Sequence, residues 1–145
     1  MAAVQTTHDR QPVTIKLSVV KGFTHKALLE WSQQHLVPAS TVISDGLACF
    51  NAVAEAGCSH DRIVCGGGRA SVEEAEFYWV NTILGNLKSA LRSTYHSVSA
   101  RYAPRYLTEF QYRFNRRFDL KSFIPRFFYV ALRTPPIPEK LLTLA

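Results

Sequence analysis

The order of strand and helix signals along these 145 residues constrains the fold more than any other feature. Residues 13–20 alternate in polarity and are rich in β-branched side chains, which predicts a strand. Residues 8–12 have the composition of a turn, and we expect them to join that strand to a shorter one over residues 2–7. Helical and strand patterns alternate from there on. A hairpin followed by such alternation predicts an α/β sheet flanked by helices on both faces.

Boundary residues delimit the later elements. Thr24 is a suitable N-cap, and Gly57 is a common type of helix end. After the hairpin we predict helix 24–36, strand 41–44, helix 47–56, strand 62–65, helix 72–91, helix 103–116 and a proline-rich tail. The order is β-β-α-β-α-β-α-α. Neither an internal repeat nor a linker is visible, so we expect residues 1–145 to form a single domain.

Charge and composition narrow the class of partner. The formal net charge is +6, which favours polyanionic partners, nucleic acid above all. Three irregularly spaced cysteines form no disulfide framework and suit a reducing compartment. No apolar run reaches the roughly 18 residues of a membrane helix, and the N-terminus lacks a secretory signal. We therefore expect a cytoplasmic protein without a membrane partner.

Asp45 stands at the end of the predicted strand 41–44 and is followed by Gly46. Open α/β sheets bind their ligands beyond the carboxyl ends of the strands, which makes this carboxylate a candidate site residue. The alternative is a structural Asp that starts a turn or caps the next helix.

The long predicted helix carries a second candidate group. Asn81 and Lys88 are seven positions apart, so at 3.6 residues per turn they share one face, with Gly85 between them. A glycine inside a helix costs about 1 kcal/mol relative to alanine, which suggests that something approaches the backbone closely there. The alternative is an ordinary polar stripe opposite a core stripe of Trp79, Ile83 and Leu87.

Cys58, His60 and Cys65 supply three possible zinc ligands. No spaced partner pair completes a structural zinc site, so we do not expect one. His60 is otherwise compatible with an ordinary turn residue.

Several runs together resemble the transposases of bacterial insertion sequences, in the DDE superfamily. The similarity is to the subgroup in which Asn replaces the final Glu and a Lys follows seven residues later. It covers nearly the whole chain and rests on residues 42–46, His60, residues 81–88, the run TYHSVS at 94–99, Arg105-Tyr106 and the run EFQYRFNRR at 109–117.

The resemblance implies an RNase H-like mixed sheet and assigns roles to these residues. Asp45 corresponds to the second metal-binding Asp, Asn81 to the Glu/Asn position and Lys88 to the accompanying basic residue, with His60 as a possible active-site neighbour. The implied cofactor is Mg²⁺ or Mn²⁺, two ions in the intact family, since two ions stabilise both the attacking and the leaving oxygen of a phosphodiester. The implied partners are DNA, as transposon ends and target, and other transposase subunits.

The last predicted helix adds a candidate DNA surface. On a helical projection Arg101, Arg105 and Arg116 lie within about 60° of one another if the helix reaches all three. Tyr102, Tyr106 and Tyr112 flank them and are suited to stacking on exposed bases. The alternative is a solvated basic face over an aromatic core.

The chain departs from the family in one respect. There the first catalytic Asp lies on the first strand of the sheet, just upstream of the hairpin, and the strand order is 3-2-1-4-5. Here the only nearby Asp is Asp9, in a predicted turn. We therefore expect an N-terminally truncated catalytic domain that lacks its central strand, so that two strands lose backbone partners.

The leading interpretation is thus a fragment of a DNA transposase catalytic domain that is inactive on its own. One alternative is a non-catalytic remnant that binds DNA or intact transposase. The other is an unrelated cytoplasmic α/β enzyme that uses Asp45 and His60.

Overall fold

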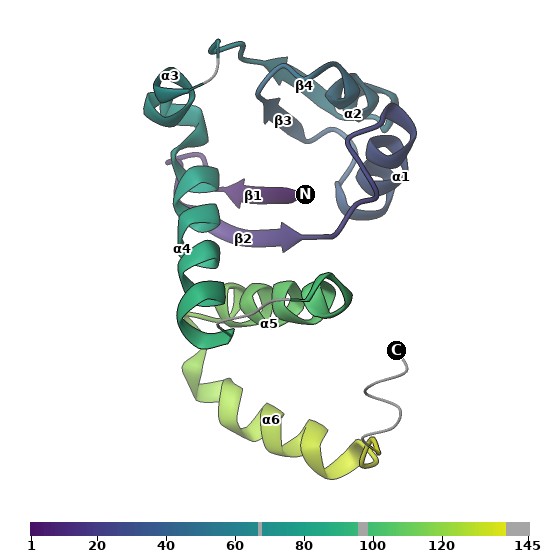
Figure 1. The fold of residues 1–145 in the computed structure, drawn as a ribbon, viewed down its shortest axis with the longest axis vertical. Coiled ribbons are helices and arrows are strands. Elements are labelled where there is room, and N and C mark those ends of the chain that lie inside the picture. Colours follow the sequence, from purple (N-terminus) through teal and green to yellow (C-terminus); the bar gives the residue numbers. More distant parts are fainter. Residues whose placement is uncertain (67, 96–98, 139–145) are drawn as a thin grey trace.

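A computed structural model of the chain describes residues 1–66, 68–95 and 99–138 (Figure 1). The strands are β1 (Ala2–Thr6), β2 (Pro12–Leu17), β3 (Thr41–Ser44) and β4 (Ser59–Arg62). The α-helices are α1 (His25–His35), α2 (Ala52–Glu55), α3 (Arg69–Glu73), α4 (Tyr78–Tyr95), α5 (Ala103–Asn115) and α6 (Leu120–Arg133). Short 3-10 turns are η1 (Ala48–Asn51), η2 (Ala75–Phe77) and η3 (Ala100–Tyr102). The fold is mixed α/β, as predicted.

The four strands form two separate sheets. β1 and β2 pair as an antiparallel hairpin, whereas β3 and β4 pair in parallel. Figure 1 shows β1 and β3 as the inner strands, facing each other across a gap. β1 is hydrogen-bonded to β2 alone and β3 to β4 alone among the described strands. Each inner strand therefore has one edge without a strand partner.

The outer edge of β2 is closed by side chains from α5. Asn115 bonds to both backbone groups of Ile15, and the Gln111 side-chain oxygen accepts from the Leu17 N–H at 2.8 Å. Amide side chains take the place of a neighbouring strand here. β1 thus carries the open edge of this sheet.

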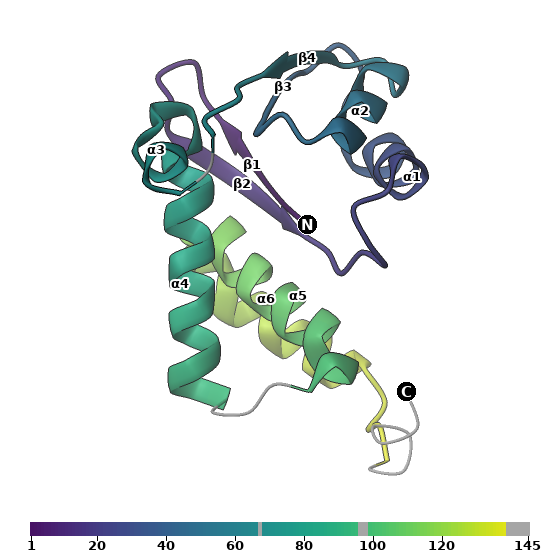
Figure 2. The ribbon, with the colours of Figure 1, turned by 45° about the horizontal axis from the view of Figure 1, so that its top comes forward.

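Two clusters of buried side chains form the core. Ile83 and Leu87 of α4 pack against Ile15 and Leu17 of β2. A second cluster lies under α1 and contains Leu28, Cys49 and Ala52. Figure 2 shows α4 running past both the hairpin and α5, and α5 itself packs directly against β2. Cys49 and Cys58 are buried free thiols and act here as small core residues.

The predicted helix over 72–91 is divided in two. α3 ends at Glu73, and Glu74 has extended backbone angles (φ −64°, ψ 121°) before η2 and α4 begin. The break brings Glu76 to Arg10, with 2.6 Å between Oε1 and Nη2, and the Trp79 indole N–H to the Arg10 carbonyl oxygen at 2.6 Å. These contacts with the hairpin turn outweigh the local helical preference.

Two further boundaries differ from prediction. β4 is residues 59–62 and not 62–65, because its register is set by pairing with β3, where Thr41 is opposite Ser59. The region after residue 116, predicted as tail, contains α6 despite Pro125. Asp119 caps this helix by accepting from the Ser122 N–H at 3.4 Å.

Candidate functional site

Asp45 follows the last residue of β3 at a turn that requires glycine. Gly46 has a φ of +84°, and a Cβ at this position would lie 2.7 Å from Val64 Cγ2. The chain therefore turns sharply and passes close to the segment after β4. The exposed Asp45 carboxylate accepts through Oδ1 from the Leu47 N–H at 3.3 Å, so part of its role is the turn-forming one anticipated as an alternative.

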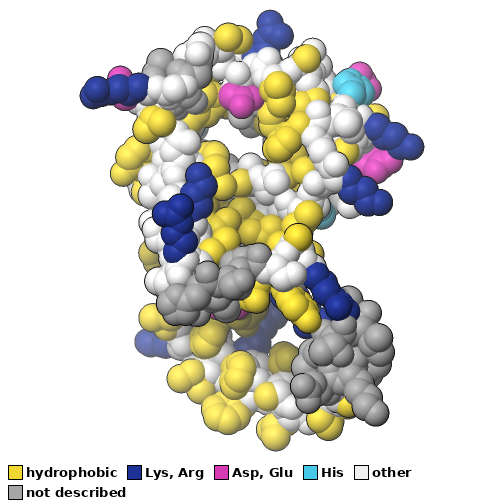
Figure 3. Space-filling view, viewed as in Figure 1, with side chains coloured by type: hydrophobic (Ala, Val, Ile, Leu, Met, Phe, Trp, Pro, Cys, Tyr) yellow, Lys and Arg dark blue, Asp and Glu magenta, His cyan; other side chains and the backbone are white. Residues whose placement is uncertain are grey.

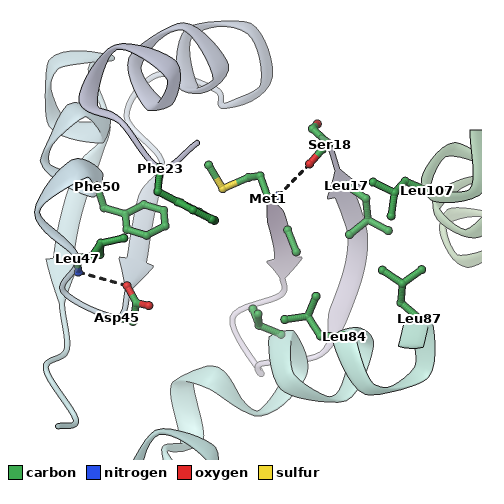
Figure 4. A pocket seen from close by; sticks show the side chains of 12 residues that line it. Met1, Leu17, Ser18, Phe23, Asp45, Leu47, Phe50, Leu84, Leu87 and Leu107 are labelled. Carbon is green, nitrogen blue, oxygen red and sulfur yellow. Dashed lines mark hydrogen bonds between the residues drawn. The ribbon is translucent and has the colours of Figure 1, made fainter. Parts of the chain in front are cut away.

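A cavity of about 410 Å³ separates the two sheets, with Asp45 on its wall. Figure 4 shows Phe23 and Met1 directed into it between β3 and β1, and Leu84 and Leu87 of α4 bordering it from below. Most other lining side chains are apolar as well, among them Leu17, Leu47, Phe50, Val80 and Leu107. The gap between the inner strands is thus an apolar space with a carboxylate at the end of β3.

The helix α4, which carries the second candidate group, lines the same cavity. Val80, Leu84 and Leu87 line it, and the half-buried Asn81 and exposed Lys88 directly follow two of them in sequence. Asn81 and Lys88 are about 20° apart around the helix axis. Asp45 and the helix that carries Asn81 therefore stand on two walls of one cavity, although 36 residues separate them in sequence (81 − 45).

No atom of the described chain makes the close approach expected at Gly85. A Cβ at Gly85 would meet no heavy atom within 4 Å. The surface of α4 between Asn81 and Lys88 is therefore open, and this glycine is not required by packing within the described residues.

The residues present do not by themselves fit a two-ion metal centre. Across the described ranges no three His, Cys, Asp or Glu side chains lie close enough together to hold a metal ion. Asp45 supplies one carboxylate and Asn81 one neutral amide, while Glu76 is paired with Arg10. Mg²⁺ usually takes one or two carboxylates together with phosphate and water oxygens, so at least one further protein ligand is needed to hold two ions.

His60 contacts the residue before Asp45. Its Nε2 lies 2.8 Å from the hydroxyl of the buried Ser44. His60 pairs in register with Val42, so its ring lies on the Ser44 face of this sheet.

The three arginines of the predicted cluster lie in two places, with Arg101 and Arg105 near the start of α5 and Arg116 just after its end. Arg101 and Arg105 flank the Tyr102 ring, with guanidinium carbons 5.8 and 5.5 Å from its centroid. Arg116 stacks on Tyr112 at 4.6 Å, and its Nε is buried without a hydrogen-bond partner. Because α5 begins at Ala103, Arg101 precedes it, and Arg105 and Arg116 are about 16 Å apart along the axis. The exposed basic group is therefore Arg101 with Arg105.

Sequence reasoning missed the residues that close the edge of β2. Besides Gln111 and Asn115, Arg117 donates to the carbonyl oxygens of Val13, at 3.1 Å, and of Pro12. Burial lowers the pKa of the Arg117 guanidinium from its ordinary value. The sequence contained one indication of this role. Gln111 and Asn115 are four positions apart, which places both amide side chains on one face of the helix.

Comparison with known proteins supplies the family. The model of the ISXO2-like transposase domain matches residues 1–115, which contain both sheets, the cavity between them, α4 and α5. No curated protein and no solved structure matches the chain. No helix in the described ranges is long and apolar enough to cross a membrane. Insertion-sequence transposases of the DDE type act on DNA and generally use divalent metal ions. Since the match spans residues 1–115 of 145, the chain belongs to the ISXO2-like transposase domain family of insertion-sequence DDE transposases.

Proposed function

We propose that this chain forms most of a DNA transposase catalytic domain and that it cuts and joins DNA only after an additional strand fills the gap between β1 and β3. The observation that carries the proposal is the apolar cavity between two inner strands, with Asp45 on its wall. Each inner strand has an edge that no strand of the described ranges pairs. An extended segment placed there would satisfy backbone groups on both sides and cover the apolar side chains.

The proposed order of strands is β2, β1, the added strand, β3 and β4. This is the RNase H-like order, with the added strand in the central position. One observation supports this strand order. Side chains of α5 close the outer edge of β2, so β1 provides the edge at which another strand can pair with this sheet.

In the completed sheet, the added strand would bring an Asp beside Asp45. Asp45, Asn81 and this Asp would then hold divalent ions, two Mg²⁺ or Mn²⁺ ions on the two-metal scheme. The ions would supply Lewis-acid stabilisation of the attacking and leaving oxygens. The observed arrangement supports roles for Asp45 and Asn81, because Asp45 lines the cavity and so do Val80 and Leu84 of the helix that carries Asn81.

Lys88 would bind a DNA phosphate beside the site. It is exposed, lies about 20° from Asn81 around α4, and is separated from it by the open surface at Gly85. A lysine ammonium is a flexible point charge suited to phosphate. Arg101 and Arg105 would hold the flanking DNA, and Arg116, partly engaged with Tyr112, would contribute less.

A second function has one observation in its favour. The described residues offer no complete metal-binding group, which suits a non-catalytic form that binds DNA or an intact transposase. The third interpretation, an unrelated enzyme using Asp45 and His60, is set aside because the chain belongs to the transposase family.

Complementation tests the proposal. The chain would be fused to, or mixed with, a segment that encodes an apolar strand with an Asp, and cleavage of DNA would be measured with Mg²⁺ or Mn²⁺. We expect cleavage by the completed protein, its loss in Asp45→Ala and Asn81→Ala, and none from the chain alone. The matched control is the same segment with Asn for its Asp. This control should protect the β1 and β3 amides from hydrogen exchange without restoring cleavage.

Two results would overturn this assignment. Cleavage by the unfused chain, abolished by Asp45→Ala, would mean that a local residue such as Asp9 or Glu76 supplies the remaining ligand. Completion of the sheet without any cleavage would favour the non-catalytic form.

A further inference from the structure

The helix α6 is a largely exposed apolar element outside the part of the chain that matches the family model. None of its residues is buried. Figure 1 shows it extending from the end of α5 away from both sheets, and Figure 3 shows hydrophobic side chains gathered over it. Its contact with α5 includes Phe123 against Tyr112, with ring centroids 5.9 Å apart.

The polar residues of α6 are confined to one narrow side. On a helical projection Ser122, Arg126 and Arg133 lie within about 40° of one another, opposite Ile124. The remaining arc is apolar apart from Lys121 in the first turn. Its large side chains include Leu120, 71% exposed, Ile124 and Phe127, both 61%, Phe128, 58%, and Leu132, 85%. This face, defined by these five residues, is called the α6 apolar face below.

The size of the α6 apolar face matches one half of a stable interface. Aromatic side chains bury roughly 150–250 Å² each when fully covered, so two phenylalanines and three smaller aliphatic side chains that are mostly exposed offer on the order of 600 Å². Val130 is the next exposed apolar residue beside Phe127 on the projection, and its 53% exposure raises this toward the roughly 800 Å² that each partner contributes to a standard interface.

We infer that the α6 apolar face docks against the same face of a second copy of this chain, related by a two-fold axis. Such a contact is self-complementary, since each copy presents the same charge-poor, phenylalanine-rich surface. Arg126 and Arg133 lie on the opposite side of the helix, so the pairing keeps both cations in water and apart from those of the other copy. Exposed large hydrophobic residues elsewhere, such as Val37, Val64 and Val72, stand at scattered positions of the described chain and offer no equal surface.

The test is the oligomeric state of the full chain. Sedimentation equilibrium with light scattering should give a dimer with a Kd of about 1 µM or tighter. Ile124→Glu combined with Phe128→Glu should weaken association at least 100-fold, since central aromatic anchors dominate such interfaces. Arg126→Gln, on the opposite side of the same helix, is the matched control and should leave the Kd within about threefold. Circular dichroism checks that both variants keep their helix content.

Three outcomes would overturn the inference. One is a wild-type monomer at concentrations near 100 µM, about a hundred times the expected Kd. Another is association, as a dimer or as larger aggregates, that persists in the double variant. The third is a monomer that floats with vesicles of phosphatidylglycerol and phosphatidylcholine and loses this binding in the double variant, which would assign the face to an anionic membrane surface.

Discussion

Asn115 forms two hydrogen bonds to a single residue 100 positions away. The Ile15 N–H donates to Asn115 Oδ1 at 2.7 Å, and Asn115 Nδ2 donates to the Ile15 carbonyl oxygen at 3.0 Å. This is the pair of bonds that a residue on a neighbouring antiparallel strand would make. One amide side chain therefore stands in for a strand and ties α5 to the hairpin.

Asn115→Ala should destabilise the protein by about 1–2 kcal/mol. The change leaves the N–H and carbonyl of Ile15 without their present partners at a partly buried position. Urea unfolding followed by circular dichroism measures the loss. Thr108→Ala, an exposed change on the same helix, is the control and should stay within about 0.5 kcal/mol. Equal stability of the two variants would contradict the strand-like role of Asn115.

Gly85→Ala should stabilise the isolated chain by about 0.5–1 kcal/mol. The new Cβ meets nothing within 4 Å, and alanine favours the helix over glycine. Thermal unfolding measures the gain. In the completed protein the same change should reduce DNA cleavage, if a phosphate approaches the α4 backbone between Asn81 and Lys88. A variant that is both more stable and fully active would show that nothing passes close to this surface.

Gly46→Ala should lower the free energy of unfolding more than Gly66→Ala does. Both glycines have positive φ angles, +84° at Gly46 and +62° at Gly66. At Gly46 the Cβ also meets Val64 Cγ2 at 2.7 Å, whereas at Gly66 it meets nothing within 4 Å. We expect about 1 kcal/mol for Gly66→Ala and at least twice that for Gly46→Ala, since strain of this kind costs about 1–3 kcal/mol. Chemical denaturation of both variants measures the two losses of stability. Equal losses would mean that the turn after Asp45 adjusts freely to the new side chain.

Replacing Arg101 and Arg105 together by Gln should lower the salt dependence of duplex binding. Each lost phosphate contact reduces the slope of log K against log[salt] by about 0.9, so the pair should reduce it by about 1.8. Arg116→Gln should change the slope less, because Arg116 is stacked on Tyr112. Fluorescence anisotropy over a range of salt concentrations tests this. An unchanged slope in the double variant would show that these two arginines form an ordinary solvated surface and do not contact DNA phosphates.

The N-terminus of α6 should be sensitive to acid. The hydrogen bond from the Ser122 side chain is the main reason that the pKa of Asp119 is lowered, and Arg116 and Arg126 lower it further. A lowered pKa in the folded state means that this stabilisation is present above the ordinary Asp pKa and disappears as the pH falls through the folded value. Hydrogen exchange of the first α6 amides should therefore speed up below about pH 4, relative to its intrinsic rate. Asp119→Ala should exchange quickly at neutral pH as well, and protection that survives this substitution would refute the capping role.

Locally encoded features were predictable from sequence. Thr24 was expected to cap a helix, and its Oγ1 accepts from the Ala27 N–H at 3.3 Å. The strand before Asp45 was expected over 41–44, where β3 lies. The cap depends on neighbouring residues alone, because helix caps are set by short-range contacts. The β-branched residues at 41–43 favour a strand locally, and pairing with β4 completes β3.

Features that depend on distant contacts were not predictable in the same way. The polar segment of β4 becomes a strand through its pairing with β3. The position of α4 depends on contacts with Arg10, and the role of Asn115 depends on Ile15. The run at 109–117 supported the family resemblance, while its part in closing the edge of β2 appeared only in the three-dimensional arrangement.

The 100-residue separation between Ile15 and Asn115 also has a consequence for synthesis. At about 5–20 residues per second, the hairpin leaves the ribosome roughly 5–20 s before α5 exists to cover β2. During that interval both edges of the hairpin are exposed, and exposed edges pair readily with other chains. The nascent chain is therefore most prone to aggregate before its α5 segment has been made, and chaperones that bind extended apolar segments should act on it within this window.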